Sequence, residues 1–196
     1  RQQYLTQANI VYLSAIFAYF ALIPLLFLAG DLIVAFTSFA PMIMSGVAFL
    51  INRKGRYGLA SLIFIFIMTL QVTISTFRYG LEPGFTFYYL NLCVLIVFTN
   101  WKGRYKLIGI IIEVILFVMV FLHAHFNGVA STMSDPYLIT FVIVNMALNV
   151  IGVSNSSHFY LMIATKAQKD LRVFATTDYL TSLPNRAAFY SFVSKI

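Results

Sequence analysis

Polar side chains recur at helical spacing within the apolar segments of this 196-residue chain, and they are the groups that could bind a ligand. Gln71, Ser75 and Arg78 stand at positions i, i+4 and i+7, which lie on one face of a helix. Asn145 and Asn149 repeat the four-residue step further along the chain. Amides, hydroxyls and charges are unfavourable in hydrocarbon unless they are paired, so we expect both stripes to point inward.

Two roles fit these stripes, and the sequence leaves both open. In a structural role, the side chains hydrogen-bond across helices, and each bond contributes about 0.6–2 kcal/mol. In a binding role, they line a periplasm-facing pocket for a small, largely hydrophobic ligand whose carboxylate or carbonyl head meets Arg78 at the mouth. The predicted ligand-binding residues are Gln71, Ser75, Arg78, Tyr88, Asn91, His123, Asn145 and Asn149.

Glu113 is a carboxylic acid within a long apolar run, about 9 Å beyond its start at a rise of 1.5 Å per residue. An acid in that position must be protonated or paired. Asn149, Asn155 and His158 are its candidate partners. We predict Glu113 and His158 as residues of an intramembrane polar switch, in which a conformation-specific hydrogen bond is favoured over a proton relay.

The cysteine and histidine residues predict no metal site. Cys93 is the single cysteine, and it lies in an apolar run, so neither a disulfide framework nor a cysteine metal cluster is expected. His123 and His125 are two positions apart, which separates them by about 200° around a helix. They cannot both bind one metal ion on an unbroken helix.

A short charged run follows the last apolar segment. After it comes the string Asp178-Tyr179-Leu180-Thr181-Ser182-Leu183-Pro184-Asn185-Arg186, and the sequence continues to Phe189. This string resembles the D-x-L-T-x-L-x-N-R-x-x-F motif that opens GGDEF domains, the catalytic modules of diguanylate cyclases. Ser182 replaces the usual Gly, and Ala187 replaces a frequent second Arg. The resemblance implies a turn and first helix that join a signalling helix to the catalytic body, through Asp178, Leu180, Thr181, Leu183, Asn185, Arg186 and Phe189.

The catalytic part of such a domain is not within these residues. The metal-binding carboxylates, the guanine-binding residues and the G-G-[DE]-E-F loop of the family are absent from the 196 residues, so this chain carries no catalytic residue and no cofactor site. The resemblance implies that GTP and Mg²⁺ bind further along a longer protein, which joins two GTP molecules into cyclic di-GMP. Because the chain begins at Arg1 and stops just after the motif, we predict that it is a fragment.

Composition indicates a membrane protein. The chain is 61% hydrophobic and 10% charged, with a mean hydropathy of +0.88, whereas about a quarter of the residues of a soluble domain are charged. The net charge of +7 does not indicate a nucleic-acid partner. The basic residues instead cluster in short turns between apolar runs, as they do beside membrane helices.

Six apolar runs are expected to span the bilayer. Short turns between them predict three consecutive hairpins, and Pro24 and Pro41 are expected to kink the first two helices. The predicted fold class is therefore all-α, a polytopic bundle whose last helix extends into a cytoplasmic signalling helix. The expected spans are Ile10–Ala29, Leu32–Ile51, Leu59–Phe77, Phe85–Thr99, Leu107–Phe126 and Tyr137–Met162.

The distribution of basic residues predicts the orientation. With these spans, 12 of the 13 Lys and Arg residues fall on one side and Arg78 alone falls on the other. The positive-inside rule assigns the basic side to the cytoplasm. We therefore expect a multi-pass membrane protein with both termini in the cytoplasm, and the resemblance to diguanylate cyclases implies that the membrane is the bacterial inner membrane.

An internal repeat marks two of the basic turns. The segment Asn52–Leu59 matches Asn100–Leu107, 48 residues later, and both contain the string K-G-R-Y. A tight cytoplasmic turn favours Gly and basic residues in any case. The exact four-residue match favours a duplicated helical pair in one orientation over the inverted repeats of many transporters.

Beyond the last span, a seam of apolar residues predicts a parallel homodimer. Ala164, Ala167, Leu171 and Phe174 follow 3-4-3 spacing. The alternative is a single amphipathic helix on anionic lipid.

The predicted domains are a sensor bundle at 1–163, a signalling helix at 164–177 and the start of a GGDEF domain at 178–196. The expected function is a ligand-sensing input module in the lipid bilayer; a passive anchor and dimeriser, or a transporter or channel, are the alternatives.

Overall fold

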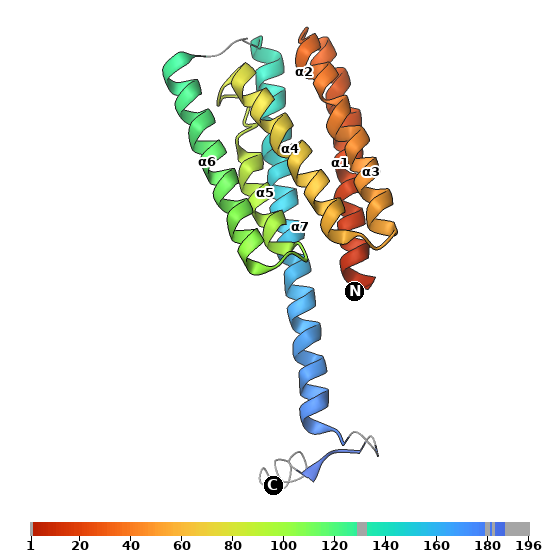
Figure 1. The fold of residues 1–196 in the computed structure, drawn as a ribbon. Helices are drawn as coiled ribbons and strands as arrows, with labels where there is room; N and C mark the ends of the chain where they lie inside the picture. Colours follow the sequence, from red (N-terminus) through yellow and green to blue (C-terminus); the bar gives the residue numbers. More distant parts are fainter. Residues whose placement is uncertain (1, 129–132, 179–180, 182, 187–196) are drawn as a thin grey trace. The chain divides into compact units, whose positions relative to one another are not determined.

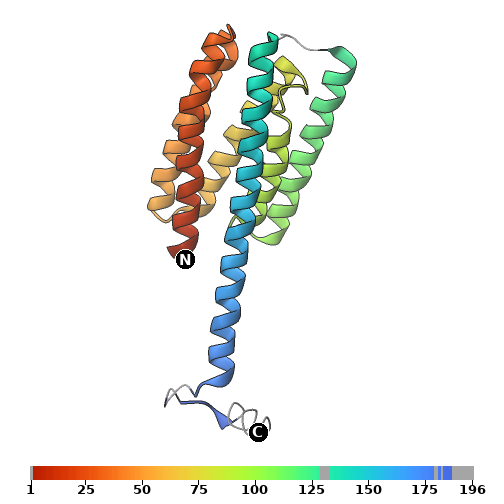
Figure 2. The same cartoon turned by 180° about the vertical axis from the view of Figure 1, so that it is seen from behind.

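The computed structural model describes residues 2–128, 133–178, 181 and 183–186, and helices dominate that part of the chain (Figures 1 and 2). An isolated antiparallel bridge joins Thr177 to Pro184, and no longer strand occurs among the described residues. The chain forms two compact units, Arg1–Val153 and Ser154–Ile196. The helices are α1 Gln2–Leu28, α2 Leu32–Thr37, α3 Phe39–Arg53, α4 Tyr57–Tyr79, α5 Phe87–Phe98, α6 Gly103–Asn127 and α7 Asp135–Thr176.

The all-α class is confirmed, and five helical stretches among the described residues are long and apolar enough to cross a membrane, which is consistent with a membrane protein. Their lengths of 21 to 42 residues exceed the roughly 20 residues that a bilayer requires. Large apolar side chains cover the outside of these stretches, most densely on α6, as is expected of surfaces that face lipid. The crossing stretches are Ala8–Leu28, Leu32–Arg53, Tyr57–Tyr79, Gly103–Asn127 and Asp135–Thr176.

The second of these stretches is broken where a kink was predicted. α2 ends at Thr37 and α3 begins at Phe39, with Ser38 between them. Pro41 has no N–H to donate to the carbonyl of Thr37 four residues earlier, so the helical ladder is interrupted there. The hydroxyls of Thr37 and Ser38 instead donate to the carbonyl of Val34, at 3.1 Å and 2.7 Å. By contrast, α1 continues as a helix through Pro24.

The fourth predicted span needs correction. The expected helix at 85–99 is the shorter α5, whose 12 residues rise about 18 Å, well below the hydrocarbon thickness of about 30 Å. A buried loop at 83–86 precedes it. Pro83 and Gly84, with a φ of +79°, prevent the helix from starting earlier. The six expected spans are therefore five long helices and one short helix.

Two hydrophobic clusters hold the first unit together. One joins α1, α2 and α4 to the buried loop and to Phe141 of α7, and the other joins α1, α3 and α4 around Tyr12 and Phe64. α1 packs on α3, α3 on α4, and α5 on α6. The predicted hairpin of α6 and α7 passes through residues 129–132, which lie outside the described residues, so the three-hairpin arrangement stays a prediction.

Candidate polar sites inside the helix bundle

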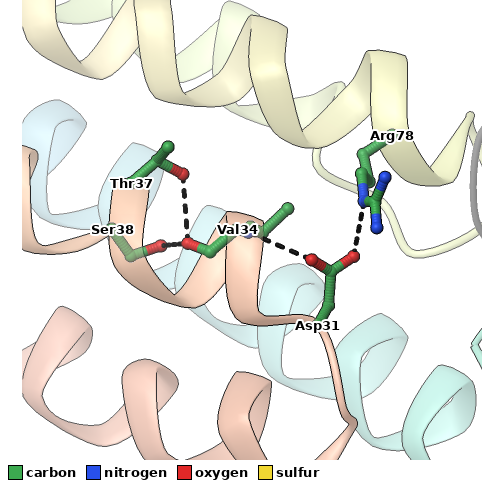
Figure 3. A network of polar contacts seen from close by, with 5 residues as sticks. All are labelled: Asp31, Val34, Thr37, Ser38 and Arg78. Atoms are coloured by element: carbon green, nitrogen blue, oxygen red, sulfur yellow. Dashed lines mark hydrogen bonds and ion pairs between the residues drawn. The ribbon is translucent and has the colours of Figure 1, made fainter.

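The start of α2 forms a corner of charged and polar contacts with α4 (Figure 3). Asp31 caps α2 by accepting a hydrogen bond from the amide of Val34 at 3.1 Å. The Nε of Arg78 donates to the other carboxylate oxygen of Asp31 at 2.7 Å. The Asp31 side chain is 4% exposed and that of Arg78 is 29% exposed, so this is a largely buried ion pair.

The electrostatics of the charged corner favour the ionised carboxylate. Burial alone would raise the pKa of Asp31, but hydrogen bonds from Arg78 and from the Val34 amide outweigh it, so the pKa lies below its usual value. The Tyr79 hydroxyl also favours the charged form from nearby, although its geometry does not complete a hydrogen bond among the described residues. Arg78 was predicted to meet the carboxylate of a ligand. Its partner in the structure is the chain's own Asp31.

The contact of Asp31 with Arg78 was not predicted from the sequence. A signal was available, because an Asp that directly precedes an apolar run is a typical helix cap. Gln71, another predicted ligand residue, donates through Nε2 to the Ser38 hydroxyl at 2.9 Å. Gln71 therefore supports the break between α2 and α3, and Ser75 is buried one turn further along α4.

Four other predicted residues come together in an amide layer, which we define as Tyr88, Asn91, Asn145 and Asn149. The side chain of Asn145 is fully buried, at 0% exposure. Its Nδ2 donates to the carbonyl of Pro83 at 2.7 Å, and its Oδ1 accepts from the Tyr88 hydroxyl at 3.1 Å. Non-helical backbone at membrane depth must find partners within the protein. Asn145 thus supplies a hydrogen-bond donor to the backbone of the buried loop at 83–86, which takes the place of the first turns of the expected helix.

The rest of the amide layer joins α5 to α7 at close range. Asn91 donates a short hydrogen bond to Asn149, and Asn149 donates to the carbonyl of Asn145 at 2.8 Å. Gly152 makes the approach possible, because a Cβ at that position would lie 2.9 Å from Oδ1 of Asn91. The spacing of Asn145 and Asn149 predicted this buried face correctly, but not the hydrogen bonds that join it to Tyr88 and Asn91.

Glu113 has a different partner from those expected. The Thr69 hydroxyl of α4 lies 2.5 Å from Oε1 of Glu113, whereas Asn149 bonds to other residues. The Thr69 hydroxyl also lies 2.9 Å from the carbonyl of Ile65. The Thr69 hydroxyl has one proton, so these two acceptors share one donor. Glu113 is 3% exposed, and its Oε2 has no partner among the described residues.

The two histidines of α6 pack against aromatic rings, and the structure does not test the predicted pairing of His158 with Glu113. His158 belongs to the unit Ser154–Ile196, so its predicted pairing with Glu113 stays a prediction. His123 packs edge-on against Phe77 at 4.5 Å between ring centroids, and His125 stacks on Phe121. Within the described residues, no group of three or more His, Cys, Asp or Glu side chains could hold a metal ion.

The described residues of the C-terminal motif fold back on the end of α7. The amide and the hydroxyl of Thr181 both donate to Oδ1 of Asp178 at 2.9 Å. The amide of Asp178 donates to the carbonyl of Leu183 at 2.8 Å. These bonds close a turn within the motif. Leu180 and Phe189 lie outside the described residues.

Asn185 ties this turn to the helix before it. Its amide donates to the carbonyl of Thr176, and its side-chain Nδ2 donates to the carbonyl of Ala175, both at 2.8 Å. The last carbonyls of a helix have no partner within the helix, so Asn185 caps α7 from ten residues away. Arg186 follows directly.

The four residues of the predicted dimer seam lie in the last part of α7. Ala164, Ala167, Leu171 and Phe174 are all exposed in the single chain. Exposed Leu and Phe side chains at this spacing suit a second copy of the helix. The parallel homodimer stays a prediction.

Comparison with known proteins adds no family assignment. No protein-family model matches the chain, and no curated protein matches it. The polar geometry therefore has to be interpreted on its own. Gln71, Arg78 and the amide layer already hydrogen-bond within the protein, which favours the structural role over a ligand pocket for these side chains.

Proposed function

We propose that the chain is the membrane-embedded input module of a diguanylate cyclase of the bacterial inner membrane, with both termini in the cytoplasm. The observation that carries the proposal is the D-x-L-T-x-L-x-N-R string at the end of α7. Its three polar residues with described contacts, Asp178, Thr181 and Asn185, each hydrogen-bond within the turn or to the last turn of α7. A capped turn supports firm attachment of a following domain.

In the proposed mechanism, α7 dimerises in parallel through the seam of Ala164, Ala167, Leu171 and Phe174. Two cyclase domains then face each other, each with GTP and Mg²⁺ in residues beyond this chain. The chain supplies no chemistry to the reaction. It positions the two domains, and the turn from Asp178 to Asn185 keeps each domain attached to its helix.

The input is proposed to be a small hydrophobic ligand that binds the bundle from the membrane or the periplasm. Such a ligand can shift the dimer only through different affinities for two arrangements. The amide layer would not hold the ligand but would transmit its binding, because Asn145 and Asn149 lie on α7 itself. The competing candidate is a passive anchor, which the internal pairing of Gln71 and Arg78 favours. A transporter or channel has no comparable support.

Incubation of the intact purified protein with GTP and Mg²⁺ tests the output. Cyclic di-GMP is the expected product, and Asn185→Ala is expected to reduce its rate while the protein still inserts in membranes. Thr140→Val is a matched control, because the exposed Thr140 hydroxyl only donates to the carbonyl of Pro136 in its own helix. An intact protein that forms no cyclic di-GMP and has no G-G-[DE]-E-F string would contradict the proposal.

Disulfide crosslinking tests the dimer seam. In a Cys93→Ser background, Phe174→Cys is expected to crosslink two copies of the protein in membranes. Val173→Cys is the control, because Val173 is also exposed but lies about 100° around the helix from the seam. Equal crosslinking at both positions would show that the seam does not direct dimerisation.

Titration with fatty acids of increasing chain length separates a sensor from an anchor. A sensor is expected to gain thermal stability at low concentrations of one chain length, because ligand binding favours the folded state. A passive anchor is expected to respond to none of them.

A further inference from the structure

The two copies of the K-G-R-Y repeat meet in the folded protein. One lies in the turn from α3 to α4 and the other at the turn from α5 to α6, and both turns lie at the end of the bundle where α1 begins (Figures 1 and 2). The indole Nε1 of Trp101 in the second turn donates to the carbonyl of Gly58 in the first at 3.2 Å. Segments 48 residues apart therefore form one continuous surface, which we call the paired basic turns.

The paired basic turns concentrate positive charge without an opposing charge. Residues 52–58 and 100–106 contain six basic residues and no Asp or Glu. Three of the six make contacts within the protein. Lys106 donates to the carbonyl of Val97, Arg104 lies over the ring of Tyr105, and Arg53 lies near the ring of Phe49.

The other three basic side chains, Lys54, Arg56 and Lys102, are exposed. Among the described residues, none of the three has a hydrogen bond or ion pair from its side chain to another residue. Like charges held this close repel each other. The surface therefore has a strong preference for an anion that can approach several of them at once.

Apolar residues beside the charges indicate what kind of anion fits. The repeat continues from K-G-R-Y to Leu59 in the first copy and to Leu107 in the second, and both leucines are exposed. Tyr105 is exposed as well, and Trp101 lies between the turns. Trp and Tyr favour the interface between lipid and water. Along the sequence, each turn thus presents cations, then a Tyr, then a Leu, which are the side-chain types that suit a phosphate, the lipid–water interface and an acyl chain.

We propose that the paired basic turns bind the phosphate headgroup of an anionic phospholipid. Lys54, Arg56 and Lys102 contact the phosphate, and the exposed Leu59 and Leu107 contact the acyl chains. Trp101 keeps the two turns together. A nucleic acid has phosphate but no acyl chains, so the leucines at equivalent repeat positions favour a lipid. This inference concerns the bundle alone and does not depend on the proposed cyclase output.

Native mass spectrometry of the protein in a neutral detergent tests the lipid site. Wild-type protein is expected to retain phosphatidylglycerol in preference to phosphatidylcholine. The triple variant Lys54→Gln, Arg56→Gln, Lys102→Gln is expected to bind phosphatidylglycerol at least about tenfold more weakly, because each cation near a membrane surface attracts anionic lipid. The control variant Lys166→Gln, Lys169→Gln, Arg172→Gln removes the same charge from α7 and is expected to bind normally.

Two more variants and two more probes identify what is bound. Trp101→Phe keeps an aromatic ring but cannot donate to Gly58, so it is expected to weaken lipid binding while the helical circular dichroism is unchanged. Inorganic phosphate and glycerol phosphate have no acyl chains and are expected not to compete, and Leu59→Ser with Leu107→Ser is expected to weaken lipid binding.

Three results would overturn the proposal. Equal loss of lipid in the α7 control variant would mean that net charge alone attracts the lipid. Competition by glycerol phosphate at matched concentration would mean a simple anion site. Binding of a short RNA with no preference for phosphatidylglycerol would identify a nucleic-acid surface.

Discussion

The charged corner and the amide layer both give partners to polar groups inside the helix bundle. The charged corner does so with an ion pair, and the amide layer does so with neutral hydrogen bonds. At the charged corner, the single ion pair of Asp31 and Arg78 joins α2 to α4, and Arg78 remains 29% exposed. In the amide layer, Asn145 is 0% exposed and every contact is between neutral groups. A charge is tolerated where water still reaches it, whereas an amide avoids the desolvation of an ion. The partly exposed site thus joins its helices with an ion pair, and the fully buried site joins them with neutral groups.

Replacement of Arg78 by Ala is expected to have the largest effect on this comparison. The variant leaves the Asp31 carboxylate buried without its cation, which costs about 3 kcal/mol, the lower end for a broken buried ion pair because Arg78 is partly exposed. The free energy of unfolding in detergent measures the loss. Arg78→Lys retains the charge and is expected to recover much of it. An Arg78→Ala variant as stable as wild type would mean that the ion pair does not hold the corner and would favour the ligand-binding role.

Asn145→Leu tests the amide layer and is expected to cost about 2 kcal/mol. Leu has a similar volume but leaves the Pro83 carbonyl without a donor, and an unsatisfied buried group costs about 1–3 kcal/mol. The free energy of unfolding is the measurement. Thr140→Val on the same helix is the control, because its hydroxyl makes only a bond within α7. Equal stability of both variants would mean that the buried loop finds another partner.

Gly152→Ala is expected to cost about 1–2 kcal/mol, because the new methyl group forces the short contact between Asn91 and Asn149 apart. Gly46→Ala is the matched control, since a Cβ there lies 4.0 Å from Ile16 in ordinary contact. That variant is expected to gain up to about 1 kcal/mol from the loss of a helical Gly. The melting temperatures of the two variants are compared. A loss only in Gly152→Ala would show that the steric contact with α5 outweighs the higher helix propensity of Ala.

Acidification is expected to reduce the stability that the charged corner contributes and to leave that of the amide layer unchanged. The expected loss is smaller than that of the substitutions above. The folded state lowers the pKa of Asp31, so its contribution to stability is complete above the unfolded pKa of about 3.9 and is lost as pH falls through the lower folded pKa. Asp31→Asn is expected to lack this part of the loss, whereas Asn145→Leu is expected to keep it. Melting temperatures between pH 3 and pH 7 measure the difference. Identical acid profiles for Asp31→Asn and wild type would exclude Asp31 as the source.

The two K-G-R-Y turns show where sequence patterns stop being sufficient. Gly55 has a φ of +81° and ends the turn after α3, while the equivalent Gly103 is the first residue of α6. The same four-residue sequence therefore adopts a different backbone conformation in each turn. In the second copy Trp101 stands where the first copy has Arg53, and its indole donates to the carbonyl of Gly58, a contact between distant segments that no local pattern contains.

Glu113 and Arg78 show the same limit for polar partners. Apolar periodicity predicted that both side chains are within reach of other polar groups, because an isolated charge in hydrocarbon is too unfavourable. It did not predict Thr69 or Asp31 as the partners, which are 44 and 47 residues away in the chain. The partner depends on which helices are neighbours, and the sequence analysis had used only the assumption of consecutive hairpins.

Composition and hydrophobic periodicity were enough to predict an all-helical chain, the positions of five helical stretches long enough to cross a membrane and the inward faces at Gln71 and Asn145. These properties are local, because each depends on transfer of a short segment from water to hydrocarbon. The short α5, the buried loop at 83–86 and the pairing of Asn145 with Pro83 required the folded structure. They depend on the packing of distant segments, whose hydrogen bonds and steric contacts are set only when the helices come together.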